Sequence, residues 1–273
     1  MRYENIHNLQ IPKIGFGTWT IGGRGQADPS VDEKSLQALR SALELGYTHF
    51  DTAEAYAAGH AEELLGQAIR ETDTPRDKLF ITSKVSPEHL GYEDVQQSCE
   101  NSLHRLEMEY LDLYLIHWPK AGMDLPEAFR ALNQLVRDGK VRHLGVSNFN
   151  LKLLKQAVDL AETPLLTDQT PYCIPDKKYV KNGVLDHCQQ NDILLTAYTP
   201  VDHRFTRGNK AIKAFAGARG ITPYQVALAW LTTQPRVITI PMSFNRQHQA
   251  DNLAAADIVF TVDEMAEIKT IFN

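Results

Sequence analysis

The sequence predicts an α/β fold, a (β/α)8 barrel of the TIM type, and two observations lead to it. Short segments rich in β-branched and aromatic residues alternate with longer segments of helical periodicity, at a repeat of roughly 30 residues. Strands separated by helices in this way run parallel. The chain has 273 residues, of which 43% are hydrophobic, and this suits one such barrel. We expect residues 1–273 to form a single domain, because no linker of Pro, Ser and Gly interrupts the repeat.

Eight segments have the composition of strands. In chain order they are Lys13–Gly17, Thr48–Thr52, Leu79–Val85, Leu111–Trp118, Val141–Ser147, Leu165–Thr170, Ile193–Tyr198 and Val237–Pro241. An open doubly wound sheet is the alternative arrangement, and it usually carries Gly-x-Gly-x-x-Gly directly after its first strand. The glycine-rich stretch at 22–25 lacks that spacing and no strand directly precedes it, which favours the closed barrel.

Seven segments between these strands place apolar residues on one helical stripe, as Leu36, Leu39 and Leu43 do in the first of them. They are Ser35–Leu45, Glu62–Ile69, Tyr92–Leu106, Pro126–Asp138, Leu151–Leu160, Tyr179–Gln190 and Pro223–Thr233. Glycines after the helical segments and a proline at the start of the last one agree with these boundaries.

Three segments lie outside the repeat. Asn5–Ile14 is predicted to form a β-hairpin, with Asn8 and Leu9 near its turn, that plugs the bottom of the barrel. Lys210–Ala218 and Asp263–Phe272 are predicted to be two extra helices.

The composition excludes several classes of protein. The net charge of −6 argues against a nucleic-acid partner. No apolar run approaches the roughly 18 residues of a membrane-spanning helix, and the first ten residues lack the apolar stretch of a secretory signal. The three widely spaced cysteines, Cys99, Cys173 and Cys188, are read as reduced thiols with no structural metal. We therefore expect a cytoplasmic protein without a membrane partner.

Catalytic groups of such a barrel lie at the carboxyl ends of its strands. The polar residues expected there are Asp51, Tyr56, Lys84, His117, Ser147, Asn148, Gln169, Tyr198 and Ser243. Each one alone is typical of a solvated rim residue or a packed core residue. Together they bring an acid, a phenol, an amine, an imidazole and several amides to one rim.

The chemistry of this set favours proton transfer to an oxygen. Lys84 lies in a strand buried on both faces, so its charge needs a carboxylate, and Asp51 is available. An ammonium beside Tyr56 is expected to lower the phenol pKa from about 10, making Tyr56 a proton donor near neutral pH. His117 would donate a hydrogen bond to a carbonyl oxygen. No Ser or Cys with an activating base is evident, so a hydride from a nicotinamide cofactor fits the attack on the carbonyl carbon.

With these residues placed, the chain resembles the aldo-keto reductases over essentially its whole length. The matching segments are Gly15–Trp19, Phe50–Tyr56 followed by Glu62–Gly66, Leu111–Pro119, Gly139–Phe149 and, less closely, Ile240–Ser243. The joint match is far more specific than any one of them.

The resemblance implies a barrel without a Rossmann motif that uses NADPH, with NADH as the alternative cofactor. It implies Tyr56 as acid and base, Lys84 and Asp51 as the pair that tunes it, and His117 as the residue that orients the carbonyl. Ser147, Asn148 and Gln169 would hold the nicotinamide carboxamide, and Tyr198 would stack under the ring. Trp19 and Trp118 would line the substrate pocket together with Tyr56 and His117. The other candidate cofactor residues are Gly17, Thr18, Asp51, Thr199, Ser243, Arg246, Asp251 and Asn252.

Two positions depart from the family pattern. Met242 and His248 stand where the family often has a lysine and an arginine that meet the 2′-phosphate. Ser243 and one nearby arginine, Arg246, remain, so a modest NADPH preference is predicted. The segment at 199–204 also differs from the common loop, and the residues that contact the pyrophosphate stay open.

The sequence thus predicts an oxidoreductase that reduces aldehydes and ketones to alcohols with NAD(P)H. Its partner is a small carbonyl compound, and it is expected to be a monomer or weak oligomer. One alternative is a regulatory subunit of the same fold with little turnover, which would lack part of the catalytic set. A second is a metal-dependent hydrolase, for which His117 and Asp51 are too few ligands.

Overall fold

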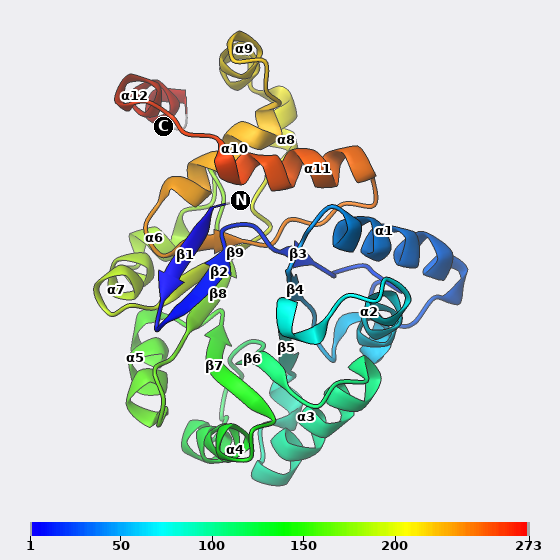
Figure 1. Cartoon of the computed structure of the whole chain (residues 1–273). Coiled ribbons are helices and arrows are strands. Elements are labelled where there is room, and N and C mark those ends of the chain that lie inside the picture. The colour runs from blue at the N-terminus through cyan, green and yellow to red at the C-terminus, as the bar shows by residue number, and fades with distance from the viewer. Residues whose placement is uncertain (1, 272–273) are drawn as a thin grey trace.

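A computed structural model describes residues 2–271, and its eight parallel strands form a barrel inside a ring of helices (Figure 1). The strands are β3 (Phe16–Gly17), β4 (His49–Asp51), β5 (Phe80–Val85), β6 (Leu111–Ile116), β7 (Val141–Ser147), β8 (Thr167–Pro171), β9 (Leu194–Tyr198) and β10 (Val237–Thr239). Each pairs in parallel with the next one along the chain. The predicted fold class is confirmed.

The barrel closes between its first and last strands. A parallel bridge joins Ile14 to Thr239, just before β3 begins. The Gly15 amide donates to the Thr239 carbonyl at 2.8 Å, and the Thr239 amide donates to the Lys13 carbonyl at 2.9 Å. The predicted first strand, 13–17, therefore forms in two parts. Its start pairs with β10, and Phe16–Gly17 pairs with β4.

Most of the helices cover the outside of the barrel. The helices are α1 (Asp32–Glu44), α2 (His60–Glu71), α3 (Tyr92–Leu106), α4 (Leu125–Arg137), α5 (Leu151–Leu160), α6 (Lys178–Lys181), α7 (Val184–Gln190), α8 (His203–Gly208), α9 (Lys210–Ala218), α10 (Pro223–Thr233), α11 (Arg246–Ala254) and α12 (Val262–Ile271). Of these, α9 and α12 lie beyond α10 (Figure 1). The main core lies between the covering helices and the strands, and every residue of β6 is buried, as a strand covered on both faces requires.

The helix predictions hold with three differences. The segment 179–190 forms two helices, because Gly183 between them adopts a left-handed φ of 83°. The helices α8 and α11 were not predicted, since α8 is short and α11 buries only Gln249. The two extra helices are present as α9 and α12, and Phe272, the predicted end of the second, lies outside the described residues.

The N-terminal hairpin plugs one end of the barrel, as predicted. Its strands β1 (Tyr3–Ile6) and β2 (Leu9–Pro12) pair antiparallel. The turn is at His7 and Asn8, whose φ angles of 46° and 66° suit a two-residue hairpin loop, rather than at Asn8 and Leu9. Ile6 packs with side chains of the barrel interior, so this end of the barrel is filled by apolar contacts.

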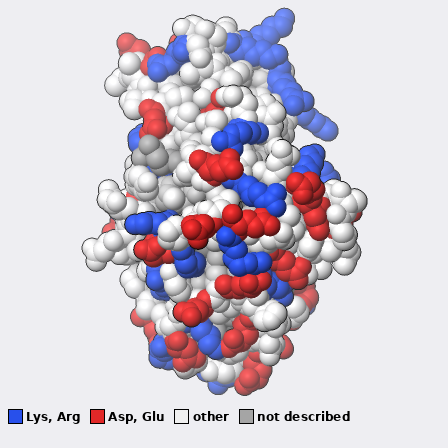
Figure 2. Space-filling view, turned by 45° about the vertical axis from the view of Figure 1, so that its right-hand side comes forward, with Lys and Arg blue, Asp and Glu red and all other residues white. Residues whose placement is uncertain are grey.

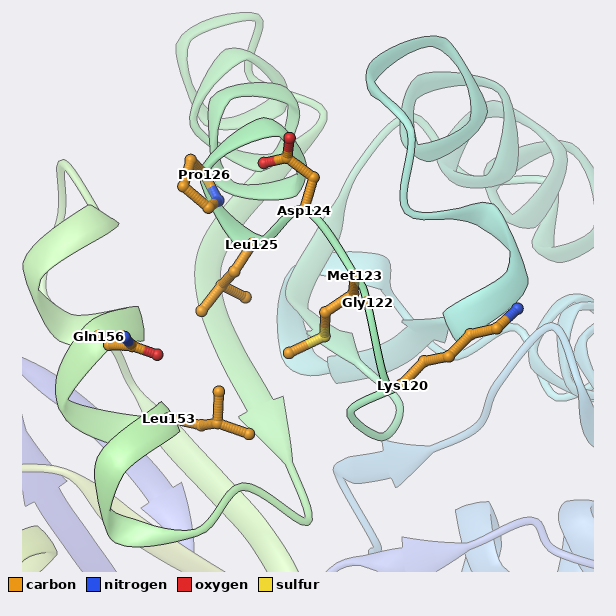
Figure 3. Close-up of a pocket in the computed structure, with 8 residues that line it drawn as sticks. All are labelled: Lys120, Gly122, Met123, Asp124, Leu125, Pro126, Leu153 and Gln156. Atoms are coloured by element: carbon orange, nitrogen blue, oxygen red, sulfur yellow. The ribbon is translucent and has the colours of Figure 1, made fainter.

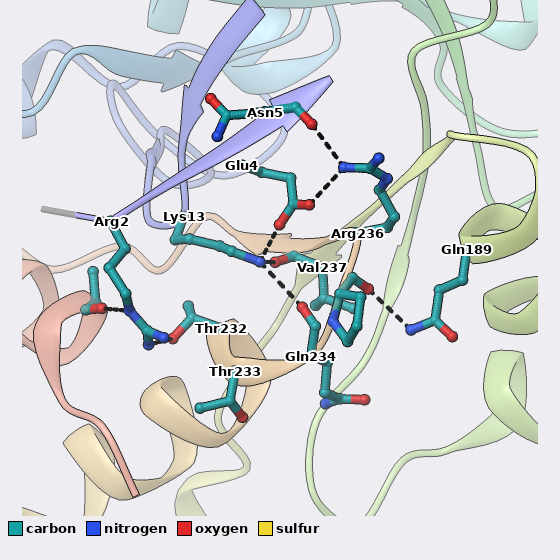
Figure 4. Close-up of polar contacts among 12 residues, drawn as sticks. Arg2, Glu4, Asn5, Lys13, Gln189, Thr232, Thr233, Gln234, Arg236 and Val237 are labelled. Carbon is teal, nitrogen blue, oxygen red and sulfur yellow. Dashed lines mark hydrogen bonds and ion pairs between the residues drawn. The ribbon is translucent and has the colours of Figure 1, made fainter. Parts of the chain in front are cut away.

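A polar network fastens the same end (Figure 4). Lys13 forms an ion pair with Glu4, and its ammonium donates to the carbonyls of Gln234 and Val237 at 3.1 Å each. Arg236 pairs with Glu4 at 2.7 Å. These contacts tie the hairpin to β10 across the line where the barrel closes.

Candidate active site

Four predicted residues meet at the opposite end of the barrel. Asp51 ends β4, Lys84 lies near the end of β5, and His117 follows β6 directly. Tyr56 begins a short 3-10 turn after β4. The strands bring these positions together because they are parallel neighbours whose carboxyl ends share one rim.

Lys84 is the centre of this group. It is fully buried, and its ammonium donates to Asp51 Oδ1 at 2.5 Å, to the Thr52 carbonyl at 2.7 Å and to Tyr56 Oη at 3.2 Å. Burial acts to lower the pKa of Lys84, but the charges and hydrogen bonds of Asp51 and Tyr56 together raise this pKa above its ordinary value. The lysine is therefore charged at neutral pH although no water reaches it.

The effect on Tyr56 differs from the sequence expectation. Burial raises the pKa of the Tyr56 phenol, and the positive charge of Lys84 offsets this only in part. The prediction that the pKa falls is wrong for the protein alone, because desolvation of the phenolate outweighs the ammonium. Tyr56 consequently keeps its proton at neutral pH.

His117 is neutral over the same range. Burial, followed by the charge of Lys84, lowers its pKa to about 2. The His117 ring lies 5.5 Å from the Tyr56 ring, and its Nδ1 has no hydrogen-bond partner among residues 2–271. A neutral imidazole has one N–H to donate, so His117 can bind an oxygen beside the phenol.

The backbone after Tyr56 forms a left-handed turn. Ala57 and Ala58 adopt left-handed φ angles of 50° and 54°, and Gly59 follows at 94°. A side chain at Gly59 would meet Arg105 at 2.7 Å, and Arg105 is itself paired with buried Glu62 at 2.7 Å. The turn thus packs against Arg105, whose carboxylate partner Glu62 is fully buried.

A chain of hydrogen bonds runs from the catalytic group along the rim. Gln169 Nε2 donates to Asp51 Oδ2 at 2.6 Å, and Ser147 Oγ donates to the Gln169 carbonyl at 2.8 Å. Asn148 Nδ2 donates to Ser147 Oγ at 2.9 Å, while Tyr198 Oη donates to Asn148 Oδ1 at 2.7 Å. This chain fixes the orientation of two amides that face the cavity described next.

A cavity of about 1020 Å³ opens above these residues, at the upper end of the range for ligand sites. Most predicted site residues line it: Gly17, Trp19, Asp51, Tyr56, His117, Trp118, Ser147, Asn148, Gln169, Tyr198, Thr199, Ser243, Asp251 and Asn252. The indoles of Trp19 and Trp118 are 53% and 39% exposed, which is unusual for so large an apolar side chain and fits an open pocket wall.

Three predicted residues do not line the cavity. Lys84 and Thr18 are fully buried behind it, where Thr18 Oγ1 donates to the Asp51 carbonyl at 3.0 Å. Arg246, in the first turn of α11, pairs with Glu44 of α1 at 2.7 Å. The structure therefore does not bring Arg246 to the other cofactor residues.

Several lining residues were missed by the sequence analysis. They are Thr20, Ala55, Pro200, Val201, His203, Arg207, Thr222, Pro223, Tyr224, Ile240 and Pro241. His203 and Arg207 are four residues apart on α8, and this spacing places both on one helical face. Recognising that helix would have marked Arg207 as a cation near the site.

A second hollow, of about 540 Å³, lies at the start of α4 beside α5 (Figure 3). Its lining includes Lys120 and Asp124 but none of the predicted catalytic residues. Within residues 2–271, no group of three or more His, Cys, Asp or Glu side chains is placed to hold a metal ion. No helix in the same range is both long and apolar enough to cross a bilayer.

Comparison with known proteins gives a consistent result. The family model described as "Aldo/keto reductase family" matches residues 13–273. The methylglyoxal reductase YeaE of Escherichia coli is 33% identical over 265 residues, which cover 95% of this chain and 90% of that protein. The glyoxal reductase of Bacillus subtilis is 33% identical over 268 residues, which cover 97% of this chain and 91% of that protein.

Solved structures agree in fold and in length. A thermostable aldo-keto reductase in complex with the inhibitor epalrestat has 40% sequence identity and a TM-score of 0.93, covering 99% of this chain and 100% of that one. An aldo/keto reductase from Klebsiella pneumoniae in complex with NADP and acetate has 35% identity and a TM-score of 0.89, and the match covers 99% of this chain and 95% of that one.

Proposed function

The chain belongs to the aldo/keto reductase family, and we propose that Tyr56 is the proton donor with which it reduces aldehydes and ketones to alcohols. The protein is an NAD(P)H-dependent oxidoreductase whose cofactor is NADPH. The observation that carries the proposed role is the contact of a buried, charged Lys84 with Asp51 on one side and the Tyr56 hydroxyl on the other.

The cavity fits a nicotinamide dinucleotide. Its volume suits a ligand of that size, and its floor offers the Ser147 hydroxyl and the amides of Asn148 and Gln169. These groups donate and accept hydrogen bonds, as a carboxamide requires. Tyr198, half-buried beside them, presents an aromatic ring to the same part of the cavity.

The reaction needs a hydride at the carbonyl carbon and a proton at the carbonyl oxygen, and bound NADPH supplies the hydride. Tyr56 donates the proton from Oη, where the raised pKa keeps it until negative charge develops on the substrate oxygen. Lys84, whose Nζ lies 3.2 Å from Tyr56 Oη, then stabilises the phenolate that remains. Asp51 keeps the ammonium in position.

His117 orients the substrate. Its neutral ring lies beside Tyr56 and gives the carbonyl oxygen a second hydrogen bond, so the oxygen points at both donors. Trp19 and Trp118 form apolar walls over this point, with the Trp19 ring 5.2 Å from Tyr56 and the Trp118 ring 4.3 Å from His117. Both rings favour a flat or small carbonyl compound.

Small 2-oxoaldehydes are the substrates we propose, together with other short aldehydes. The relatives named methylglyoxal reductase and glyoxal reductase match nearly the full chain. The proposal that residues 1–273 are one catalytic domain rests on the same coverage. Cytoplasmic location is proposed from three free, buried cysteines, Cys99, Cys173 and Cys188. We still expect the protein to be a monomer or a weak oligomer.

The regulatory alternative gains no support, since the similar proteins are named reductases and the four proposed catalytic residues converge. A steady-state assay of the purified protein tests the proposal. We expect NADPH-dependent reduction of methylglyoxal and of short aldehydes, with lower kcat/KM for NADH. A protein that binds NADPH but turns over none of these compounds would favour the regulatory role.

A further inference from the structure

Few positively charged side chains line the cavity, although the nicotinamide dinucleotide proposed to bind there carries several negative charges. Among the described residues that line it, Arg207 is the one Lys or Arg. Three histidines, His117, His203 and His248, also line it, and its carboxylates are Asp51 and Asp251. Asp51 is neutralised by Lys84, whereas Asp251 adds negative charge near the Ser243 end. Phosphates bound here need a compensating cation.

Arg207 has the geometry for that role. Its Nε donates to the Tyr224 hydroxyl at 2.9 Å, and Tyr224 is also a lining residue. No ion pair joins Arg207 to a carboxylate among residues 2–271, so its outer N–H groups are not committed to a protein anion. An exposed arginine held at one nitrogen can direct the others at a ligand.

The residues expected to supply this charge do not. Arg246 pairs with Glu44 and is outside the lining, and Met242 has no charge. His248 lines the cavity, but it lacks the planar fork of five donors with which an arginine binds a phosphate. These observations leave Arg207 as the strongest anion-binding group that the cavity contains.

We infer that Arg207, positioned by Tyr224, binds a phosphate group of the dinucleotide. This inference rests on the proposed function, because it concerns the cofactor of that reaction. The phosphate is either the pyrophosphate bridge, which NADH and NADPH share, or the 2′-phosphate, which only NADPH carries.

The surrounding segment adds to the positive potential. Residues 199–220 contain five Lys or Arg and one Asp, in a chain with a net charge of −6. Figure 2 shows Lys and Arg side chains gathered at the upper right of the molecule and Asp and Glu side chains at its upper left, and α8 and α9 lie at this upper end in Figure 1. Arg207 is thus the inward member of a basic region that attracts anions to the cavity.

Direct binding measurements test this inference. Arg207→Gln keeps hydrogen-bonding capacity but removes the charge, and Arg204→Gln, also on exposed α8 surface but outside the lining, is its matched control. Kd values for NADPH and NADH are measured by quenching of protein fluorescence at several salt concentrations. We expect Arg207→Gln to weaken NADPH binding about 10- to 100-fold and to flatten its salt dependence. Arg204→Gln should change Kd less than about twofold.

The NADH titration identifies the phosphate. Equal losses for NADH and NADPH assign Arg207 to the pyrophosphate, and a loss confined to NADPH assigns it to the 2′-phosphate. Tyr224→Phe should give a smaller loss in the same direction, because it frees the guanidinium without removing it. An Arg207→Gln protein that binds both cofactors within twofold of the parent overturns the inference. Failure of the parent protein itself to bind either cofactor would instead overturn the proposed function.

Discussion

Lys13 and Lys84 are buried at opposite ends of the same barrel, with exposed fractions of 6% and 0%. Each ammonium has three partners, and one of the three is a carboxylate. Lys13 meets Glu4 and two backbone carbonyls, whereas Lys84 meets Asp51, one carbonyl and the Tyr56 hydroxyl. The two sites satisfy the same requirement of a desolvated charge.

The two lysines differ in their third partner, which is a backbone carbonyl for Lys13 and the Tyr56 hydroxyl for Lys84. A carbonyl cannot lose a proton, so the Lys13 site can only hold the hairpin against β10. A phenol can lose one, so the Lys84 charge acts on a group that titrates. Burial lowers the pKa of Lys13 in spite of Glu4, while Asp51 and Tyr56 overcome burial and raise the pKa of Lys84. A buried lysine is therefore functional or structural according to what it contacts, and its burial alone does not tell which.

The largest expected effect is that of Tyr56→Phe. Removal of the hydroxyl deletes the proton donor and should reduce kcat about 10²- to 10⁴-fold. The Kd for NADPH and the melting temperature should stay close to those of the parent, since the ring and its contacts with Trp19 and His117 remain. Single-turnover reduction of methylglyoxal measures the loss, and a variant that keeps more than about a tenth of the parent rate contradicts the role.

A paired substitution tests the comparison of the lysines. Lys84→Met should lower kcat at least about 100-fold, because the phenolate loses its stabilising charge. Lys13→Met should leave kcat unchanged and lower the free energy of unfolding by about 1–3 kcal/mol, because two buried carbonyls lose their donor. Urea titrations and initial rates on both variants give the result. A loss of rate in Lys13→Met without a loss of stability would break the distinction.

Acid sensitivity is expected to depend on His117. Its pKa is near 6.5 when unfolded and about 2 when folded, so between these values the unfolded chain binds the additional proton. The stability that this neutral histidine contributes is present above pH 6.5 and is lost as the pH falls. His117→Gln should therefore reduce the pH dependence of the unfolding free energy by about 1.4 kcal/mol per pH unit between pH 6 and pH 4. Urea titrations at pH 6, 5 and 4 give the change of the unfolding free energy with pH for the parent protein and for His117→Gln. An equal change in both proteins would disprove the lowered pKa of His117.

Ala58→Gly should have the smallest effect. Ala58 is exposed and adopts a left-handed φ of 54°, which costs an alanine roughly 1 kcal/mol and a glycine almost nothing. Part of the gain is lost to the greater freedom of glycine in the unfolded chain, so we expect stabilisation of about 0.5 kcal/mol. Thermal unfolding measures it. A destabilised variant would mean that contacts of the Ala58 methyl group outweigh the backbone strain.

Periodicity determined much of the fold. The bounds of α3, α5, α9, α10 and β7 agree with the sequence prediction to the residue. These elements bury one clear apolar face or, for β7, most of their length, so local pattern and packing point the same way. The helices that the sequence missed lack this property, as α11 with its single buried residue illustrates.

The convergence of the four predicted catalytic residues was also predictable, since each lies near or after the carboxyl end of a strand of a parallel barrel and a buried lysine demands a carboxylate. The directions of the pKa shifts and the interatomic distances could not be predicted from the sequence. The pKa of Tyr56 rises because the three-dimensional structure removes water from the phenol, and sequence spacing carries no measure of that burial.

The candidate cofactor residues show most clearly what cannot be predicted from the sequence. The sequence by itself identified Arg246 as the cation near Ser243, because the two are close in the chain. Only the tertiary structure decided that Arg246 pairs with Glu44 on another helix and that Arg207, from α8, faces the cavity. Sequence fixes which charges are present, but the packing of distant helices decides which charge is neutralised by a protein partner and which is left to meet a ligand.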